Sequence, residues 1–185
     1  MPDPIFNTTP GQTIAREQMI CFLNTGSYAA PQWSALGTRV EESSESFDWS
    51  DESKQDILGN THSTMNKPII TQSFEPCNLD AADSAISKVW ELGVKDQDNH
   101  ALASMDLLIV HLYAGAEGAA FAERYPSSMV KPTGLGGGGG GSMEMPIDVT
   151  YGGKREVGTA ALAADGTPTF AKSGANVASY GLNEE

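Results

Sequence analysis

The sequence predicts a mainly β fold of the α+β type: a small antiparallel β-sandwich or open barrel with one flanking α-helix. Three observations support this fold class. Apolar and polar residues alternate over most of the chain, which is the period of a half-buried strand. Glycine-containing turns separate these alternating segments. A single segment has helical spacing, and one helix must lay its apolar stripe on the sheet to bury it.

The clearest predicted strand covers residues 142–151, where every second residue is apolar. These apolar residues are Met143, Met145, Ile147, Val149 and Tyr151. Pro146 cannot donate a ladder hydrogen bond, so it indicates a sheet edge or a bulge. Residues 107–113 are apolar on both faces, which predicts a central strand. The other predicted strands cover residues 17–23, 36–49, 67–74, 154–163 and 167–171, with turns at Gly152-Gly153 and Asp165-Gly166.

Residues 79–92 are predicted to form the helix, with Asn78 as its N-cap and Gly93 at its end. Five apolar residues of this segment fall on one stripe: Leu79, Ala82, Ile86, Val89 and Trp90. We expect Ile86, Val89 and Trp90 to be core residues that pack on the sheet.

Two segments have unusual compositions. Residues 41–56 carry seven carboxylates and one lysine, Lys54, so their mutual repulsion predicts a solvated hairpin or a mobile loop. The seven acidic residues are Glu41, Glu42, Glu45, Asp48, Asp51, Glu52 and Asp56. Residues 134–141 are glycine apart from Leu135, which predicts a loop, whether native or an introduced linker. A phosphate-binding loop is disfavoured because a strand, rather than a helix, is predicted to follow.

Length and charge restrict the classes of function. We expect one domain over residues 1–185, because a chain of 185 residues is of ordinary domain size. The formal charge of −13 opposes broad binding to nucleic-acid phosphates or anionic lipids. No apolar run approaches the roughly 20 residues needed to span a bilayer, and no signal-like segment opens the chain. A soluble protein without membrane anchoring is therefore expected.

No residue pattern predicts catalysis, a metal site or a cofactor. Cys21 and Cys77 lack metal-ligand spacing and are predicted to be buried thiols rather than a disulfide. The scattered histidines, His62, His100 and His111, are predicted to be structural or exposed. Since no nucleophile, base and orienting group can be assembled, we expect a protein that is not an enzyme.

Three alternatives remain open for single features. The acidic run of residues 41–56 offers carboxylates for calcium or for glycosidic chemistry, although it lacks the calcium-loop form. Trp33, Trp49 and Trp90 are candidates for a sugar-binding platform, and Trp90 is more simply explained as core.

The order of the features resembles the tail tube proteins of long-tailed bacteriophages and related contractile bacteriocins. The resemblance covers roughly residues 17–171 and is a pattern of order and spacing. It begins with Trp33-Ser-Ala-Leu-Gly37, the strand-like residues 38–46, Asp56-Ile-Leu-Gly59, residues 67–74 and the predicted helix. It closes with residues 143–151, Gly152-Gly153, Val157-Gly-Thr159 and Thr167-Pro-Thr-Phe170. The six glycines of residues 136–141 and the segment 93–122 depart from the pattern.

The resemblance implies a self-assembling structural protein. In such a protein each subunit lends strands to a continuous inner barrel, six subunits close a ring, and rings stack into a tube. An acidic lumen would conduct DNA passively, and the acidic residues of segment 41–56 would order on ring stacking. The implied partners are further copies of the chain, a tape measure protein in the lumen, baseplate or tail-tip proteins, a tail terminator and a contractile sheath. The implied location is the virion tail, assembled in the bacterial cytoplasm.

Two other functions are compatible with the same sequence. One is the tube of a phage-derived bacteriocin or injection device, in which no genome passes through the lumen. The other is a β-sandwich adhesion module, in which Trp33 or Trp49 would stack on sugars.

Overall fold

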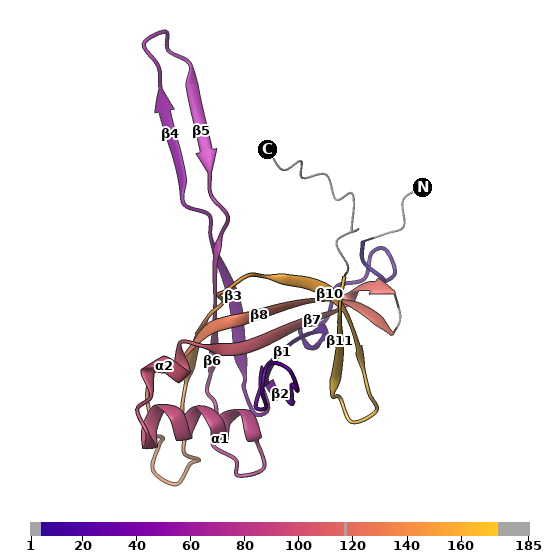
Figure 1. Ribbon diagram of the computed structural model, residues 1–185, viewed down its shortest axis with the longest axis vertical. Helices are drawn as coiled ribbons and strands as arrows, with labels where there is room; N and C mark the ends of the chain where they lie inside the picture. The colour runs from indigo at the N-terminus through magenta and orange to yellow at the C-terminus, as the bar shows by residue number, and fades with distance from the viewer. Residues whose placement is uncertain (1–4, 117, 174–185) are drawn as a thin grey trace.

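Most of the chain forms one curled antiparallel sheet with the shape of a half-barrel, from which a thin hairpin projects (Figure 1). This computed structural model describes residues 5–116 and 118–173. The nine strands of the sheet within those residues are β1 (Met19–Asn24), β2 (Trp33–Leu36), β3 (Glu42–Asp48), β6 (Ile69–Glu75), β7 (Met105–Ala116), β8 (Ala119–Pro132), β9 (Ile147–Thr150), β10 (Glu156–Leu162) and β11 (Pro168–Lys172). The hairpin consists of β4 (Asp51–Gln55) and β5 (Thr61–Met65). The predicted mainly β fold with a flanking helix is confirmed.

The long strand β8 joins the two halves of the sheet. One of its edges pairs with β7, while its other edge pairs first with β10 and then with β9. The path β2-β1-β7-β8-β9-β6-β3 therefore runs through β8, and β11 extends the sheet beyond β10. Strand β7 lies between β1 and β8, which confirms the central strand predicted for residues 107–113.

The sheet does not close into a barrel. Within the described residues, β2 pairs only with β1, β3 only with β6, and β11 only with β10. Each of these three strands leaves one row of backbone hydrogen-bonding groups without a strand partner. Such edges are sites at which another chain can add.

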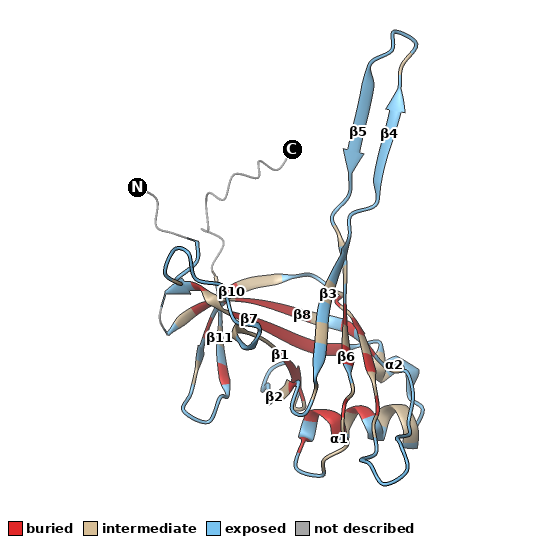
Figure 2. Cartoon of the chain, turned by 180° about the vertical axis from the view of Figure 1, so that it is seen from behind, coloured by how far each residue is buried: buried red, intermediate tan, exposed pale blue. Residues whose placement is uncertain are grey.

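Buried side chains lie on both faces of the central strands, as the continuous apolar run of β7 requires. Figure 2 shows the buried residues gathered along β7, β8 and α1, while β4 and β5 are exposed. The inner face packs against helix α1 (Ser84–Trp90), and this core includes Leu23, Leu107, Ile109, Ile147 and Val149. The opposite face holds a smaller cluster formed by Phe22, Leu108, Val110, Ala120, Ala122 and Ala160. The free thiols of Cys21 and Cys77 are buried in the larger core, as predicted.

The helix begins later than predicted. Asp83 is its N-cap, since its side chain accepts a hydrogen bond from the Ile86 amide at 3.1 Å. Asn78 instead forms an isolated bridge with Glu144, so the prediction of an Asn78 cap is wrong. The helical path also continues beyond Gly93, through the π-helical segment η2 (Glu91–Lys95), and a short helix α2 (Asn99–Leu102) follows.

Gly93 is therefore a packing residue and not a helix stop. A Cβ atom at this position would lie 2.5 Å from Cγ of Pro132 at the end of β8. The proline ring cannot move away as a flexible side chain could, so only glycine lets η2 pack this closely.

The predicted core residues of the helix separate into two classes. Ile86 and Val89 are 1% and 0% exposed, whereas Trp90 is 36% exposed, so the prediction that Trp90 is a core residue is wrong. The buried face of the helix consists instead of Ala85, Ile86 and Val89.

We expect Ile86→Ala to lower the free energy of unfolding by about 2–5 kcal/mol, because it leaves a cavity in the main core. Trp90→Ala is expected to cost less than about 2 kcal/mol, since part of that ring is already in water. Urea unfolding of both variants measures the difference. Equal losses would show that the ring of Trp90 carries as much of the core as Ile86 does.

Two predicted strands are shorter than expected. The segment predicted at residues 36–49 divides into β2 and β3, because residues 37–39 form a turn. The segment predicted at residues 142–151 forms a strand only in β9. Its inward alternation holds for Met145, Ile147, Val149 and Tyr151, while Met143 is exposed. Residues 134–141 lie in the predicted loop, with one isolated bridge from Gly136 to Glu144.

Candidate assembly site

The most prominent surface feature is the arm, defined here as residues 51–65, which comprise β4, β5 and the turn between them. It extends far from the body, at the end of the molecule opposite to α1 and α2 (Figure 1). Every residue of β4 and β5 is exposed. An isolated two-stranded hairpin is marginally stable in water at best. The arm therefore depends on its connection to β3 and β6 and on whatever it contacts.

The acidic segment 41–56 forms β3 and β4, which do not pair with each other: β3 pairs with β6, and β4 pairs with β5. The segment is therefore one side of a longer hairpin, and neither the predicted hairpin within residues 41–56 nor the predicted loop is formed. Its carboxylates are not gathered in one place. Glu41 and Glu42 lie at the start of β3, and Asp51 and Glu52 lie on the arm. All four side chains are exposed. Asp48 lies at the end of β3, and its carboxylate accepts from the Ser50 amide at 3.1 Å. Glu45 lies on β3, and Asp56 lies in the turn that follows β4.

The tip of the arm, residues 56–60, is a tightly hydrogen-bonded turn. The Asp56 carboxylate accepts from the backbone N–H groups of Leu58 at 2.8 Å and Asn60 at 2.9 Å, and it also contacts His62 at 3.1 Å. The Asn60 amide, followed by the His62 side chain, lowers the pKa of Asp56 to about 2. Gly59 has a φ of +84°, which favours glycine at this point of the turn.

This turn presents two apolar side chains to solvent. Ile57 is 102% exposed and Leu58 is 81% exposed. Neither side chain can be explained by packing within the subunit. Two adjacent large apolar residues on a locked turn are typical of a contact with another molecule. In the sequence, this contact site is visible as the Ile-Leu pair between Asp56 and Gly59. A pair of apolar residues is equally typical of a buried strand, so the pair alone does not predict an exposed tip.

More apolar side chains are exposed where the arm joins the body. Phe47, Trp49, Met65 and Ile69 are between 48% and 66% exposed. The junction is held by backbone contacts, since the Asn66 amide donates to the carbonyl of Trp49 at 3.2 Å. The candidate assembly site therefore consists of the apolar tip and this apolar junction, which are joined by the polar shaft of the arm.

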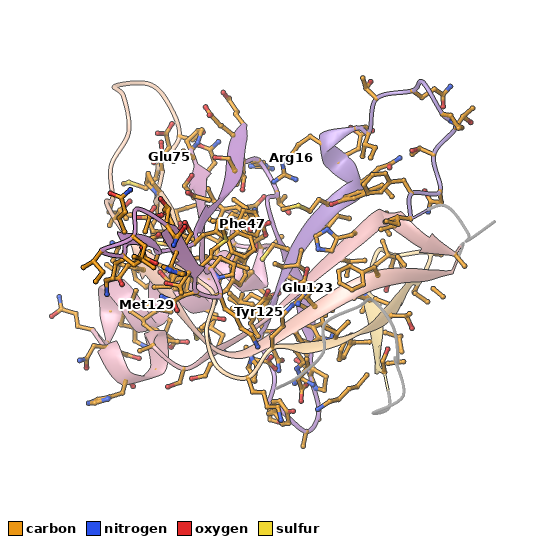
Figure 3. The ribbon with its side chains drawn as sticks, turned by 90° about the horizontal axis from the view of Figure 1, so that it is seen from above. Arg16, Phe47, Glu75, Glu123, Tyr125 and Met129 are labelled. Carbon is orange, nitrogen blue, oxygen red and sulfur yellow. The ribbon has the colours of Figure 1, made fainter. Side chains whose placement is uncertain are left out.

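A second group of polar residues, the inner polar cluster, lies inside the curl of the sheet, beyond the apolar core. It consists of His111 on β7, Glu123 and Tyr125 on β8, and Arg155 before β10. The Glu123 carboxylate accepts from Tyr125 at 2.7 Å and Arg155 at 2.6 Å, and it contacts Nε2 of His111 at 3.1 Å. Figure 3 shows the molecule from above, with Glu123 and Tyr125 of this cluster and the nearby Arg16 labelled.

The inner polar cluster keeps Glu123 ionised. Burial by itself would raise the pKa of Glu123, but hydrogen bonds from His111, Arg155 and Tyr125 outweigh burial and lower it to about 2. Burial together with the Glu123 charge raises the pKa of Tyr125 well above its ordinary value. The structural role predicted for His111 agrees with these contacts.

The depressed pKa of Glu123 predicts acid sensitivity. The stabilisation is present above the carboxyl's ordinary pKa of 4.5 and is lost as the pH falls from 4.5 to about 2. We expect it to amount to about 3 kcal/mol at neutral pH. Urea unfolding at a series of pH values should show a smaller loss in this window for Glu123→Gln. A variant whose acid transition matches the parent's would contradict this assignment.

The three tryptophans lie on separate elements and do not form a shared platform. Trp33 on β2 lies 5.4 Å from the Arg124 guanidinium and packs on the smaller core cluster. Trp49 lies at the arm junction, and Trp90 ends α1. The sugar-binding platform considered from the sequence is therefore not assembled by this fold.

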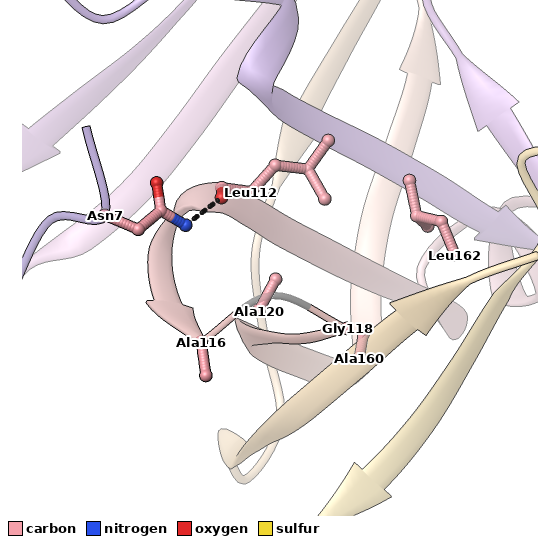
Figure 4. Close-up of a pocket in the computed structure, with 7 residues that line it drawn as sticks. All are labelled: Asn7, Leu112, Ala116, Gly118, Ala120, Ala160 and Leu162. Atoms are coloured by element: carbon pink, nitrogen blue, oxygen red, sulfur yellow. Dashed lines mark hydrogen bonds between the residues drawn. The ribbon is translucent and has the colours of Figure 1, made fainter. Parts of the chain in front are cut away.

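The body has several open surface hollows. One, with a volume of about 430 Å³, is lined mostly by small apolar residues near the end of β7 (Figure 4). Its Asn7 amide donates to the carbonyl of Leu112 at 2.8 Å, so this polar group is already engaged. Within residues 5–116 and 118–173, no set of three metal-ligating side chains comes together. In the same ranges, no helix has the length and apolar character needed to cross a bilayer.

Comparison with known proteins gives a likeness in structure alone. No family model and no curated protein matches the chain. The sheath/tube terminator of the extracellular contractile injection system PVC, in its extended state, is 10% identical with a TM-score of 0.51. That match covers 80% of this chain and 99% of the terminator. The tube terminating cap of the anti-feeding prophage is 11% identical with a TM-score of 0.50, over 86% of this chain and 99% of the cap.

A third structure, the PVC sheath-tube complex in its extended state, is 8% identical with a TM-score of 0.48, over 80% of this chain and 93% of the matched chain. At these identities the likeness concerns the fold. The chain thus shares its fold with terminating components of contractile injection systems.

Proposed function

We propose that this chain is a structural subunit of a tail-type tube and acts without catalysis. The observation that carries the proposal is the combination of a half-barrel with three open edges and an exposed arm that has no core of its own. A subunit of this form is incomplete by itself, because both features need neighbours. The fold shared with tube-terminating proteins supports the same role.

Ring formation would use the open edges of the sheet. Pairing of β2, β3 or β11 with a neighbouring copy removes unpaired backbone groups without new secondary structure. Repeating one such contact around an axis closes a ring. We propose a ring of six copies, as in the tail tube proteins that the sequence resembles.

Stacking would use the arm. A contact between one end of a subunit and the opposite end of the next is heterologous and can repeat along an axis. The arm reaches beyond the body at one end of the long axis, so its tip meets the next ring first (Figure 1). In this proposal Ile57 and Leu58 provide the apolar contact, and the acidic residues of segment 41–56 keep the arm solvated until it docks.

The two structures of comparable fold that support this argument are terminating components, which end a tube. We therefore propose either the terminating ring or the repeating ring of such a tube. A contractile sheath, a tape measure protein and baseplate or tail-tip proteins are the proposed partners. The proposed particle is a virion tail assembled in the bacterial cytoplasm, or a phage-derived bacteriocin or injection device.

The charge of the subunit fits a lumen through which DNA passes without binding. The sequence has 24 carboxylates against 11 lysines and arginines. Several of those cations are used within the subunit, as in the pairs Arg124–Asp106, Arg155–Glu123 and Lys172–Glu156. An acidic surface repels phosphates, so DNA would slide along it.

Electron microscopy of the purified chain tests the proposal. Because subunits of charge −13 repel one another, samples should be compared at about 0.05 M and 0.5 M salt, where screening differs. Rings or tubes are expected at high salt. Isolated rings would indicate that the chain forms the terminating ring of a tube. Long tubes would indicate that it forms the repeating ring. A monomer under all conditions that binds glycans would overturn the proposal in favour of an adhesion module.

Assembly should also change the exchange of backbone amides in residues 41–56. We expect the arm amides in this segment to exchange within seconds in the free subunit, because their side chains are exposed and pack on no core. In assembled rings they should be protected by contacts with the next ring. Hydrogen exchange followed by mass spectrometry compares the two states, and equal protection in both would exclude the arm from the interface.

A further inference from the structure

Strand β3 carries one acidic side chain that faces inward. Glu45 pairs with Gln72 of β6, so both side chains lie on the same face of the sheet. Gln72 is buried, and its amide donates to the hydroxyl of Ser43 on this same face at 2.8 Å. Glu42, three residues earlier on β3, is exposed. Glu45 thus differs from the other acidic residues of segment 41–56 because its side chain faces the inside of the half-barrel.

The charge of Glu45 interacts with titratable groups on several other elements of the half-barrel. The groups whose charges interact with it come from the segment before β1, from β1, β7 and β8, and from the residue after β9. They are Arg16, Cys21, His111, Tyr113, Glu123, Tyr125 and Tyr151. The charge of Glu45, on the strand that leads into the arm, therefore interacts with the charges of the inner polar cluster.

One oxygen of Glu45 has no hydrogen-bond donor. Its Oε1 atom is buried, and within the described residues it has no partner. Three side chains of the inner polar cluster contact Glu123, and Arg16 donates to the carbonyls of Ser43 at 3.1 Å and Met19 at 2.7 Å. The Tyr151 hydroxyl is bonded to Gln72. A buried charged oxygen without a donor is costly.

Protonation removes this cost. A neutral carboxyl group carries no buried charge, and its O–H group can donate a hydrogen bond. Burial raises the pKa of Glu45, and the charge of Glu123 adds to that rise, whereas His111 and Arg16 oppose it. The Glu123 carboxylate thus has three hydrogen-bond partners, whereas one oxygen of the Glu45 carboxylate has none within the described residues.

We propose that Glu45 is a proton-operated latch that holds the arm-bearing strand β3 against the inner wall of the half-barrel when neutral and releases it when ionised. The direction follows from linkage. A carboxyl pKa that is raised by folding gives stability that is complete below the unfolded pKa and is lost as pH rises through the folded pKa. The base of the arm is therefore held more firmly in mildly acidic solution than at neutral pH. This inference concerns the single subunit and does not depend on ring formation.

Hydrogen exchange of the unassembled subunit at low salt tests the latch. Protection of the β3 amides, corrected for the intrinsic effect of pH, is compared with that of the β7 amides between pH 4.5 and 8. We expect the ratio of β3 to β7 protection to fall at least about threefold as the pH rises through the pKa of Glu45. Glu45→Gln should keep the ratio of the acidic sample at every pH. Glu42→Gln, the matched control on the same strand, should behave as the parent.

Three results would overturn the latch. The first is a constant ratio in the parent protein, and the second is an unchanged pH dependence in Glu45→Gln. The third is a Glu45 carboxyl ¹³C resonance in the parent protein that titrates at or below the ordinary pKa of a glutamate. Like the first, it does not require a folded variant. A subunit that never forms rings but has the expected exchange would refute the proposed function and leave the latch intact.

Discussion

Replacing both Ile57 and Leu58 with aspartate is expected to abolish ring stacking and to leave the folded subunit unchanged. The two side chains have essentially no contacts within the subunit, so their loss removes no core packing. In an interface, apolar anchors of this kind contribute about 2 kcal/mol or more each. Losing both, and adding two charges to a subunit of charge −13, should weaken stacking by more than about a hundredfold.

Sedimentation velocity and electron microscopy measure the stacking, and thermal unfolding measures the fold. The matched control is Thr61→Asp with Thr64→Asp, which adds the same charge to exposed positions on the shaft of the arm. We expect the control to assemble at high salt with the same melting temperature as the parent. Stacked rings formed by the tip variant would contradict the role of the tip. Loss of stacking in both variants would assign the effect to charge alone.

Replacing Asp106 with alanine is expected to lower the free energy of unfolding by about 3–5 kcal/mol. Asp106 and Arg124 are each about 10% exposed, and Nε and Nη2 of Arg124 donate to the two carboxylate oxygens at 2.9 and 2.6 Å. Asn24 donates to the same carboxylate at 2.8 Å. Without Asp106, the buried guanidinium has lost its counter-charge and Asn24 has lost an acceptor. The expected loss is a large part of the stability of a domain this size.

Urea unfolding at pH 7 measures this loss. Glu91→Ala is the matched control, because Glu91 also forms an ion pair, with Lys95 at 2.7 Å, but both side chains are more than half exposed. The control should cost less than about 1 kcal/mol. If Asp106→Ala unfolds at the parent's urea concentration, the packing of Arg124 on Tyr28, 4.0 Å away, must hold that region without the ion pair.

Local patterns in the sequence were enough to identify most strands. The alternation from Met145 to Tyr151 and the uniformly apolar run of β7 depend only on the side chains themselves. The helix was located, but its start was not. Asn78 and Asp83 are both acceptable N-caps by residue type. The choice between them depends on the chain before the helix, where the Met145 amide bonds to the Cys77 carbonyl and so holds that segment extended.

The acidic segment shows what a charge count cannot resolve. Seven carboxylates predicted a solvated segment, and the exposed arm agrees with this. Glu45 nevertheless points inward, because strand pairing with β6 determines which alternate residues face the sheet interior. Likewise, Ile57 and Leu58 appear in sequence as ordinary apolar residues, and only the position of their turn at the end of a long hairpin leaves them without neighbours.

A mainly β chain with one helix, buried thiols, a solvated acidic segment and a strongly negative subunit could all be predicted from the sequence. These properties follow from composition and from the periods of adjacent side chains, which act within a few residues. Only the tertiary contacts make β8 a strand shared by two halves of the sheet, leave open edges on β2, β3 and β11, and turn Glu45 towards the inside of the half-barrel. Those features arise from contacts between residues far apart in the chain, and the free energy of such contacts depends on strand register and order, which no local pattern encodes.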